Sequence, residues 1–359
     1  MSGKSGRRSF LRKIGIGSVG TVMLPATNLM AGESGQPEIA GPDAGLPAQH
    51  TFNGSYSGTY LNRIAFPIGG MGAGMFCLEG TGAISHMSVC HKPEIFHEPS
   101  VFAAISVKGL KNGAKLLEGN VPDWKKFGQK DAGNGSTGAT TGLPRFRSTS
   151  FQARFPFAQL DMQDPDLPLQ VKLIGWSPFV PGEEDNSSLP LGAMEYHFTN
   201  TGTTTIDAVF SFNAKNFLRE EEGQNSIRAI QNGFILAEAG TKEKPYPSEF
   251  AVFTEEQSTV DHCWFRGGWW DPLTMAWNAV KNAEVISVAP VEKDAPGASL
   301  YVPFLLSPGV KKQIRVRFAW YTPETDIQFG DPARNKENCD PAAGCCNSPS
   351  DIGDRKSVV

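Results

Sequence analysis

The chain of 359 residues lacks a long apolar run and has no excess of positive charge. No uncharged apolar stretch reaches the roughly 18 residues that a membrane-spanning helix needs. Lys and Arg number 33 against 37 Asp and Glu, for a formal net charge of −4, so there is no basic surface on which a phosphate backbone would release counterions. Turn-forming residues are plentiful, at 39 Gly and 26 Pro. We therefore expect no nucleic-acid partner, and a long helical bundle is disfavoured.

Familiar signatures of nucleophilic and nucleotide-binding enzymes are absent as well. The chain has no Gly-x-Ser-x-Gly elbow and no Ser-His-Asp order. The Gly-rich segment 67–74 fails the dinucleotide-binding spacing, because Met75 and Cys77 stand where a third Gly is needed, and no Lys-Ser or Lys-Thr follows it. We interpret this segment as a tight connection between strands, in which Gly permits positive φ or close backbone packing. No cofactor is predicted.

The N-terminus has the plan of an export signal. Residues 1–13 contain five Lys and Arg and no acid, and a weakly hydrophobic stretch follows at 14–24. The segment resembles the bacterial twin-arginine (Tat) signal through Arg7, Arg8, Phe10 and Leu11. That resemblance implies the Tat export machinery as a partner and a periplasmic or extracellular location. We expect a signal peptide over residues 1–31; the alternative is an uncleaved basic amphipathic anchor.

The rest of the chain divides into a linker, one large domain and a tail. Residues 32–50 are polar and broken by Pro and Gly, so we expect a linker there. From Thr51 the apolar period is mostly two, which is typical of strands with one solvent-facing side. We predict an all-β fold over residues 51–330, a large β-sandwich with long loops and one or two short helices. Residues 331–359 are polar and Cys-rich, and we expect a disordered or truncated tail.

Several elements can be placed along the large domain. The clearest strand pattern runs from Leu191 to Thr199, with apolar and polar side chains in alternation. A second run begins at Ile206 after the turn residues 200–202, so the pair predicts a β-hairpin. We expect a helix within 274–285 and a surface loop over 125–145. Six further segments have strand patterns: 102–107, 170–174, 233–237, 250–254, 298–306 and 313–321.

Metal binding has two candidate locations, and neither is favoured. Pro93 and Pro99 oppose a helix around the first, and a strand would point Glu94 away from the nearby His side chains. We therefore interpret this group as polar side chains on a solvent-facing strand or loop: His86, His91, Glu94, His97 and Glu98. The second is the tail cluster Cys339, Cys345 and Cys346, where a disulfide or a soft metal site is conceivable but the Cys-x-x-Cys spacing of zinc sites is missing. No metal site is predicted.

An acidic turn over 176–190 combines Trp176 with Glu183 and Asp185. A glycosidase needs two carboxyl groups about 5 to 9 Å apart across the sugar. Neighbouring carboxylates in a solvated loop diverge and do not meet that requirement. We therefore weigh contact with a sugar or a partner at these three residues against a plain solvated turn.

An aromatic segment over 264–271 poses the same kind of choice. Trp269 and Trp270 beside Asp271 are able to stack on a sugar ring, and they are equally able to pack in a core. The residue types do not decide between these two interpretations. All three are kept as candidate substrate contacts.

Three segments together resemble the N-terminal domain of glycoside hydrolase family 116. The family consists of bacterial and animal β-glucosidases, which include the non-lysosomal glucosylceramidase or bile-acid β-glucosidase type. The segments are the Gly-rich stretch 64–74, the stretch 176–190 with its continuation to 202, and Leu306-Ser307-Pro308-Gly309 with Phe318-Ala319-Trp320. The likeness covers roughly residues 55–325, in the order that the family shows.

The resemblance implies a β-sandwich that packs against a C-terminal (α/α)6 barrel, which carries the Glu nucleophile and the Asp acid/base of a retaining mechanism. Neither residue can be carried over, because this chain stops where the barrel would begin, so no catalytic residue is predicted here. We expect the non-catalytic part of an exported β-glucosidase or glucosylceramidase-like hydrolase, which shapes the substrate entrance for a β-glucoside or a glycolipid glucoside. The alternative is a stand-alone exported carbohydrate-binding module.

Overall fold

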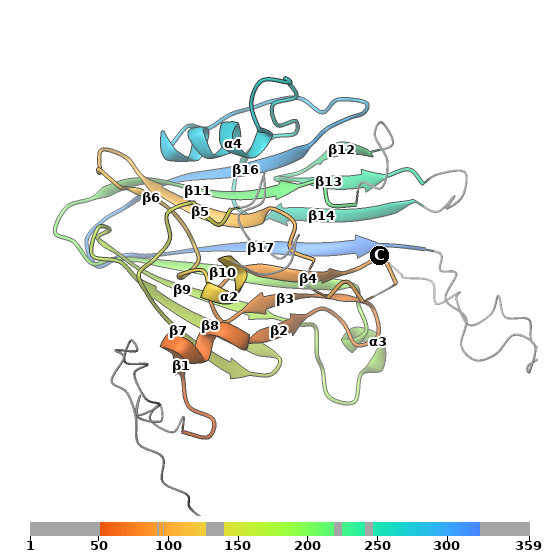
Figure 1. Ribbon diagram of the computed structural model, residues 1–359, viewed down its shortest axis with the longest axis horizontal. Helices are drawn as coiled ribbons and strands as arrows, with labels where there is room; N and C mark the ends of the chain where they lie inside the picture. Colours follow the sequence, from red (N-terminus) through yellow and green to blue (C-terminus); the bar gives the residue numbers. More distant parts are fainter. Residues whose placement is uncertain are drawn as a thin grey trace, which may run out of the picture. The chain divides into compact units, whose positions relative to one another are not determined.

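The computed structural model describes residues 51–91, 93–95, 97–126, 140–218, 225–240 and 247–323 (Figure 1). The expected signal peptide (1–31), linker (32–50) and tail (331–359) lie outside the described residues, as does the part of the predicted surface loop from 127 to 139. Within the described part of the chain, no helix is long and apolar enough to cross a membrane.

Antiparallel strands form three sheets, which confirms the all-β prediction. The nine-stranded sheet has the order β1 (Tyr56–Ser57), β7 (Ser148–Arg154), β8 (Phe157–Gln163), β9 (Leu169–Trp176), β10 (Leu191–Asn200), β17 (Lys311–Tyr321), β14 (Ser248–Thr254), β13 (Gly233–Glu238) and β12 (Asn225–Ile230). The five-stranded sheet has the order β15 (Thr259–Asp261), β16 (Gly297–Leu306), β11 (Ile206–Lys215), β5 (Val101–Val107) and β6 (Ala114–Leu116). The three-stranded sheet has the order β2 (Ala65–Ile68), β3 (Met75–Glu79) and β4 (Ile84–Ser88).

The core lies between the nine-stranded and five-stranded sheets. Along β9 and β17, buried and more exposed side chains alternate, so one face of the larger sheet turns inward. Across the interface Tyr196 of β10 meets Phe210 of β11 with ring centroids 5.0 Å apart, and Phe318 of β17 meets Phe212 at 5.2 Å. Each such buried aromatic side chain contributes roughly 1.5 to 3 kcal/mol of hydrophobic stabilisation. The two sheets are therefore the layers of a sandwich.

The three-stranded sheet packs on the same inner face, over β9 and β10. Its Ile68 is fully buried against two strand glycines of the larger sheet. A Cβ atom on Gly192 would lie 2.3 Å from Ile68 Cγ2, and one on Gly175 would lie 2.7 Å from Ile68 Cδ1. No larger residue fits at either position, so these glycines permit the close approach of the two layers.

Helices are short and peripheral among the described residues. They are the 3-10 helix η1 (Gly58–Arg63), the single turns α2 (Asp123–Lys126) and α3 (Glu184–Ser187), and the ten-residue α4 (Pro272–Lys281). Helix α4 covers the outer face of the five-stranded sheet (Figure 1), where Leu273 and Val280 join a cluster with Phe102. The helix expected within 274–285 thus exists, but it begins at Pro272 and ends at Lys281.

The predicted hairpin between the runs at 191–199 and 206–212 is wrong. Strand β10 pairs with β9 and β17, whereas β11 pairs with β5 and β16 in the facing sheet. The chain thus crosses from one sheet to the other between β10 and β11. The side-chain amide of Asn200 stabilises this connection, since its Nδ2 donates to the carbonyl oxygens of Thr204 at 2.9 Å and Leu306 at 2.8 Å. Alternation predicts which side of a strand is buried, but it does not predict which strand lies next to it.

Candidate functional site

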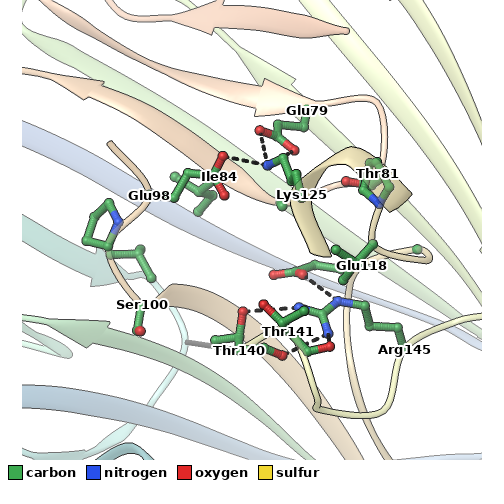
Figure 2. A pocket seen from close by; sticks show the side chains of 16 residues that line it. Glu79, Thr81, Ile84, Glu98, Ser100, Glu118, Lys125, Thr140, Thr141 and Arg145 are labelled. Atoms are coloured by element: carbon green, nitrogen blue, oxygen red, sulfur yellow. Dashed lines mark hydrogen bonds and ion pairs between the residues drawn. The ribbon is translucent and has the colours of Figure 1, made fainter. Parts of the chain in front are cut away.

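Five ionisable side chains converge in a buried cluster beside the three-stranded sheet (Figure 2). They come from five separate places: the end of β3, the connection between β4 and β5, the residues after β6, helix α2 and the residues before β7. All five side chains are at most 11% exposed. We call this group the charge cluster: Glu79, Glu98, Glu118, Lys125 and Arg145.

One ammonium group bridges two of the carboxylates. Lys125 Nζ donates to both oxygens of Glu79, at 2.6 and 2.7 Å, and to Glu98 Oε1 at 2.6 Å. Figure 2 shows both carboxylates directed at this ammonium. Burial, together with the charge of Glu79, raises the pKa of Glu98 to about 7, although Lys125 acts in the opposite direction. Glu98 therefore exchanges a proton near neutral pH.

Arg145 neutralises the third carboxylate and ties down its own loop. Its Nε donates to Glu118 Oε2 at 3.0 Å. Its Nη1 donates to three carbonyl oxygens, those of Thr140, Thr141 and Leu143, at 2.8 to 3.1 Å. A guanidinium with several fixed donors suits such a role better than an ammonium does. The loop before β7 is thereby held against the sandwich.

The space within the charge cluster is small. It amounts to about 50 Å³, enough for a few water molecules, whereas sites for ligands of drug size span several hundred Å³. Among the described residues, no group of three or more His, Cys, Asp and Glu side chains could hold a metal ion. The arrangement can take up and release a proton at Glu98, and it joins five segments of the chain.

The charge cluster was not predicted from the sequence. Glu98 lies in a loop, one of the two positions expected for it, but its side chain is only 11% exposed; residues 125–145 were expected to form a surface loop, yet Lys125 lies on α2 with its side chain 4% exposed. The surface-loop prediction is wrong at Lys125, because polar residue types were taken to mean exposure. The sequence does contain a signal for helix α2, though not for the charge cluster: the pair Pro122-Asp123 is typical of the start of a helical turn.

The three segments that carry the family resemblance meet in space. Met71 N donates to Ser187 O at 2.8 Å, and Trp320 Nε1 donates to Ala73 O at 2.6 Å. A Cβ atom on Gly70 would lie only 2.2 Å from Leu189 O, so glycine is required there. The Gly-rich segment is the β2–β3 connection, as predicted, with Gly72 at φ 75°. We call the contact between 67–74, 176–190 and 318–320 the loop junction.

The loop junction presents apolar side chains to solvent. Met71 is 53% exposed and Val180 is 41% exposed, and Phe155 beside them packs edge-on against Phe179 with centroids 4.9 Å apart. The predicted contact residues Glu183 and Asp185 lie here too, both exposed at the start of α3, where Glu183 accepts a hydrogen bond from Asn186. Their role as substrate contacts stays a prediction.

The remaining predicted contacts lie in two other places. Trp176 ends β9 on the outer face of the nine-stranded sheet, where it lines a hollow. Trp269 and Trp270 precede α4 and are exposed, so neither packs in the core. Asp271 caps α4, because its Oδ2 accepts from Thr274 N at 3.1 Å. The structure therefore does not bring the six predicted residues together, and their contact with a ligand stays a prediction.

Cysteine chemistry gives no site in the described part of the chain. Cys77 and Cys263 are free thiols. Burial raises the pKa of Cys77 to about 11, so it stays protonated at neutral pH. The predicted tail cluster of Cys339, Cys345 and Cys346 lies outside the described residues.

Comparison with known proteins identifies one matching family. Residues 65–337 match the family described as beta-glucosidase 2, glycosyl-hydrolase family 116 N-term. None of the curated proteins compared with the chain matches it.

Several solved structures share a remote likeness. One is a candidate kojibiose phosphorylase from the human microbiome, with 8% identity, a TM-score of 0.34, and 79% of this chain but 27% of that chain covered. A candidate aldose 1-epimerase from Escherichia coli K12 has 10% identity, a TM-score of 0.35 and 72% and 99% coverage of the two chains. The Slr1438 protein from Synechocystis sp. PCC 6803 has 12% identity, a TM-score of 0.33 and 74% and 99% coverage. This chain thus spans about a quarter of the first of these proteins.

Proposed function

The chain belongs to the N-terminal domains of glycosyl-hydrolase family 116, and on that premise we propose that it is the non-catalytic part of an exported β-glucosidase or glucosylceramidase-like hydrolase. Its partner is a C-terminal (α/α)6 catalytic domain, on which it packs and whose substrate entrance it shapes. The substrate that passes this entrance is a β-glucoside or a glycolipid glucoside. Export by the Tat machinery, through Arg7 and Arg8, to the periplasm or the cell exterior is part of the proposal.

The loop junction is the observation that carries the proposal. It is rigid, because backbone hydrogen bonds and a required glycine join its three segments. It also exposes Met71 and Val180, with the exposed Phe155 packed beside it on Phe179, apolar side chains of the kind that become buried when two domains meet. Glu183 and Asp185 on the same loop supply polar groups at the rim. A fixed, partly apolar surface with a polar rim suits a contact that borders a sugar site.

The charge cluster supports a non-catalytic role. A retaining glycosidase holds two carboxyl groups on either side of the scissile bond. In this cluster Glu79 and Glu98 instead share one ammonium within a space of about 50 Å³, which leaves no room for a sugar ring between them. The cluster holds the domain together, and the hydrolytic carboxyls belong to the barrel.

The test combines this chain with the separately produced barrel domain of a family-116 β-glucosidase. Alone, the purified chain is expected to show no turnover of an aryl β-glucoside. Together, the two should sediment as a complex with hydrolytic activity. Met71→Lys and Val180→Lys should break the complex, because a buried unpaired charge is costly. Leu305→Lys, at a position 72% exposed on β16, is the matched control and should leave it intact.

Two results would overturn the proposal. Turnover by the chain alone would place catalytic carboxyls within it. Failure to associate with the barrel, in a chain that stays folded and monomeric, would favour the stand-alone binding module. Export is tested separately, by fusing residues 1–31 to a reporter: replacement of both Arg7 and Arg8 by Lys should abolish Tat-dependent transport.

A further inference from the structure

The outer face of the nine-stranded sheet contains a hollow of about 280 Å³ over β7, β8, β9 and β10. Strand register places its lining in two adjacent cross-strand rows. The aromatic row runs from Arg154 through Phe157 to Trp176. The polar row runs beside it through Gln152, Gln159, Ile174 and Glu195. Two rings thus lie next to a line of amide and carboxylate groups, with Ile174 as the apolar member of that line.

A chain of hydrogen bonds holds the Trp176 ring in place. Trp176 Nε1 donates to Glu195 Oε1 at 3.2 Å. The same oxygen accepts from Arg315 Nε at 2.6 Å, and Glu195 Oε2 accepts from Gln313 Nε2 at 2.9 Å. The indole therefore has a fixed position, although its residue is only partly buried. A ligand that stacks on it meets a preorganised surface and loses less binding free energy to ordering of the side chain.

The charged groups around the hollow already have hydrogen-bond partners. Glu195 is neutralised by Arg315. The Arg154 guanidinium donates to the side chain and the main chain of Asn53, at 3.2 and 2.6 Å, and to Ala153 O. A charged ligand would have to compete with these partners. The hollow thus suits an uncharged molecule that has an apolar face and a rim of hydroxyl groups.

We propose that this hollow binds a neutral pyranose, stacked on Trp176 and Phe157 and hydrogen-bonded along the polar row. A pyranose with only hydrogen atoms in its axial positions, such as β-linked glucose, presents a flat C–H face to an aromatic ring and equatorial hydroxyls at its edge. The volume of the hollow suits one or two such rings. This subsite acts in binding only, and it goes beyond the proposed function because it needs no catalytic domain.

The experiment measures binding of cellobiose to the full chain by isothermal titration calorimetry, with methyl β-galactopyranoside as a comparison that has one axial hydroxyl. Saturable binding of cellobiose is expected, with weaker binding of the galactoside. Trp176→Ala should weaken binding by about tenfold, the size of effect that an aromatic contact provides. Leu305→Ala is the control, because it removes an apolar side chain that is 72% exposed on β16 of the other sheet, and it should leave the affinity unchanged.

Further variants separate loss of binding from loss of folding. Trp176→Phe keeps an aromatic ring without the indole N–H, and Gln152→Ala removes one amide of the polar row at the sheet surface; each should weaken binding severalfold, with the urea unfolding midpoint close to that of the parent chain. Absence of cellobiose binding at millimolar concentrations would overturn the proposal. So would wild-type affinity in folded Trp176 variants, or loss of affinity in Leu305→Ala. None of these outcomes depends on association with a barrel domain, so this subsite and the proposed function fail independently.

Discussion

The charge cluster and the hollow on the outer sheet face are built from the same kinds of group. In each, a carboxylate is paired with a cation and a Trp ring lies alongside: Glu79, Lys125 and Trp124 in the cluster, and Glu195, Arg315 and Trp176 in the hollow. They differ in burial. The difference lies in the cations, since the Lys125 side chain is 4% exposed and that of Arg315 32%, whereas the Glu79 and Glu195 side chains are 8% and 14% exposed.

That difference in burial separates a structural role from a binding role. A buried ion pair is destabilising to break, because each partner left behind is an unpaired charge in a medium of low dielectric constant. A pair that water reaches contributes little to folding. In the hollow, the ion pair instead fixes an aromatic ring that stays accessible to a ligand. The same residue types therefore stabilise the fold in one place and prepare a surface in the other.

The largest effect is expected from removal of the cation at the centre of the charge cluster. Lys125→Met leaves Glu79 and Glu98 buried without a partner, so the free energy of unfolding should fall by about 3 to 5 kcal/mol. The neighbouring Lys126→Met is the matched control. Within the described part of the chain Lys126 pairs with the exposed Asp123, so its replacement should change stability by less than about 0.5 kcal/mol. Urea unfolding of the two variants measures both values, and equal losses would contradict the comparison.

The next effect concerns pH. Burial and the charge of Glu79 raise the pKa of Glu98 from its ordinary value of 4.5 to about 7. Between these pH values the folded chain holds a proton that the unfolded chain releases, so the contribution of Glu98 to stability falls as pH rises from 4.5 to 7 and is constant above that. The decrease amounts to at most about 3 kcal/mol.

Glu98→Gln should remove this part of the pH dependence, because the amide carbonyl can still accept from Lys125 but cannot titrate. Urea unfolding at a series of pH values from 4.5 to 8 checks the change in slope. Glu183→Gln, on the exposed turn 176–190, serves as the control and should keep the parent slope. A Glu98→Gln profile that matches the parent chain would show that Glu98 is not the titrating group.

Strand positions were predictable because each depends on local alternation. The segments expected at 170–174 and 313–321 correspond to β9 and β17, whose burial alternates residue by residue. The partner of β11 was not predictable from the same signal. A period of two sets the buried side of a strand, whereas its neighbour depends on the sheet into which the chain crosses after Asn200.

The residues of the hollow and of the charge cluster likewise differ in how far the local sequence predicts them. Trp176 could be selected from the sequence as an aromatic residue at a polar turn, but its place in the hollow depends on register with β8 and β10. The charge cluster was not predictable, since Lys125 meets Glu79 across 46 residues and Glu98 across 27, and no local pattern marks those pairs. Polar residue types favour exposure on average, and only the tertiary contacts identify the buried exceptions.

A smaller effect on stability than that of Lys125→Met or of Glu98 is expected at Arg315, and it tests the comparison most directly. Arg315→Met removes the cation from Glu195, just as Lys125→Met removes it from Glu79, but Gln313 and Trp176 remain as hydrogen-bond donors to the carboxylate. The free energy of unfolding should fall by at most about 1 kcal/mol. The freed carboxylate should also hold the Trp176 indole less firmly, so cellobiose affinity should drop even though stability hardly changes. Lower cellobiose affinity at nearly unchanged stability would show that the Glu195–Arg315 pair orients a binding surface. A loss of stability as large as that of Lys125→Met would instead show that the two carboxylates have the same structural role.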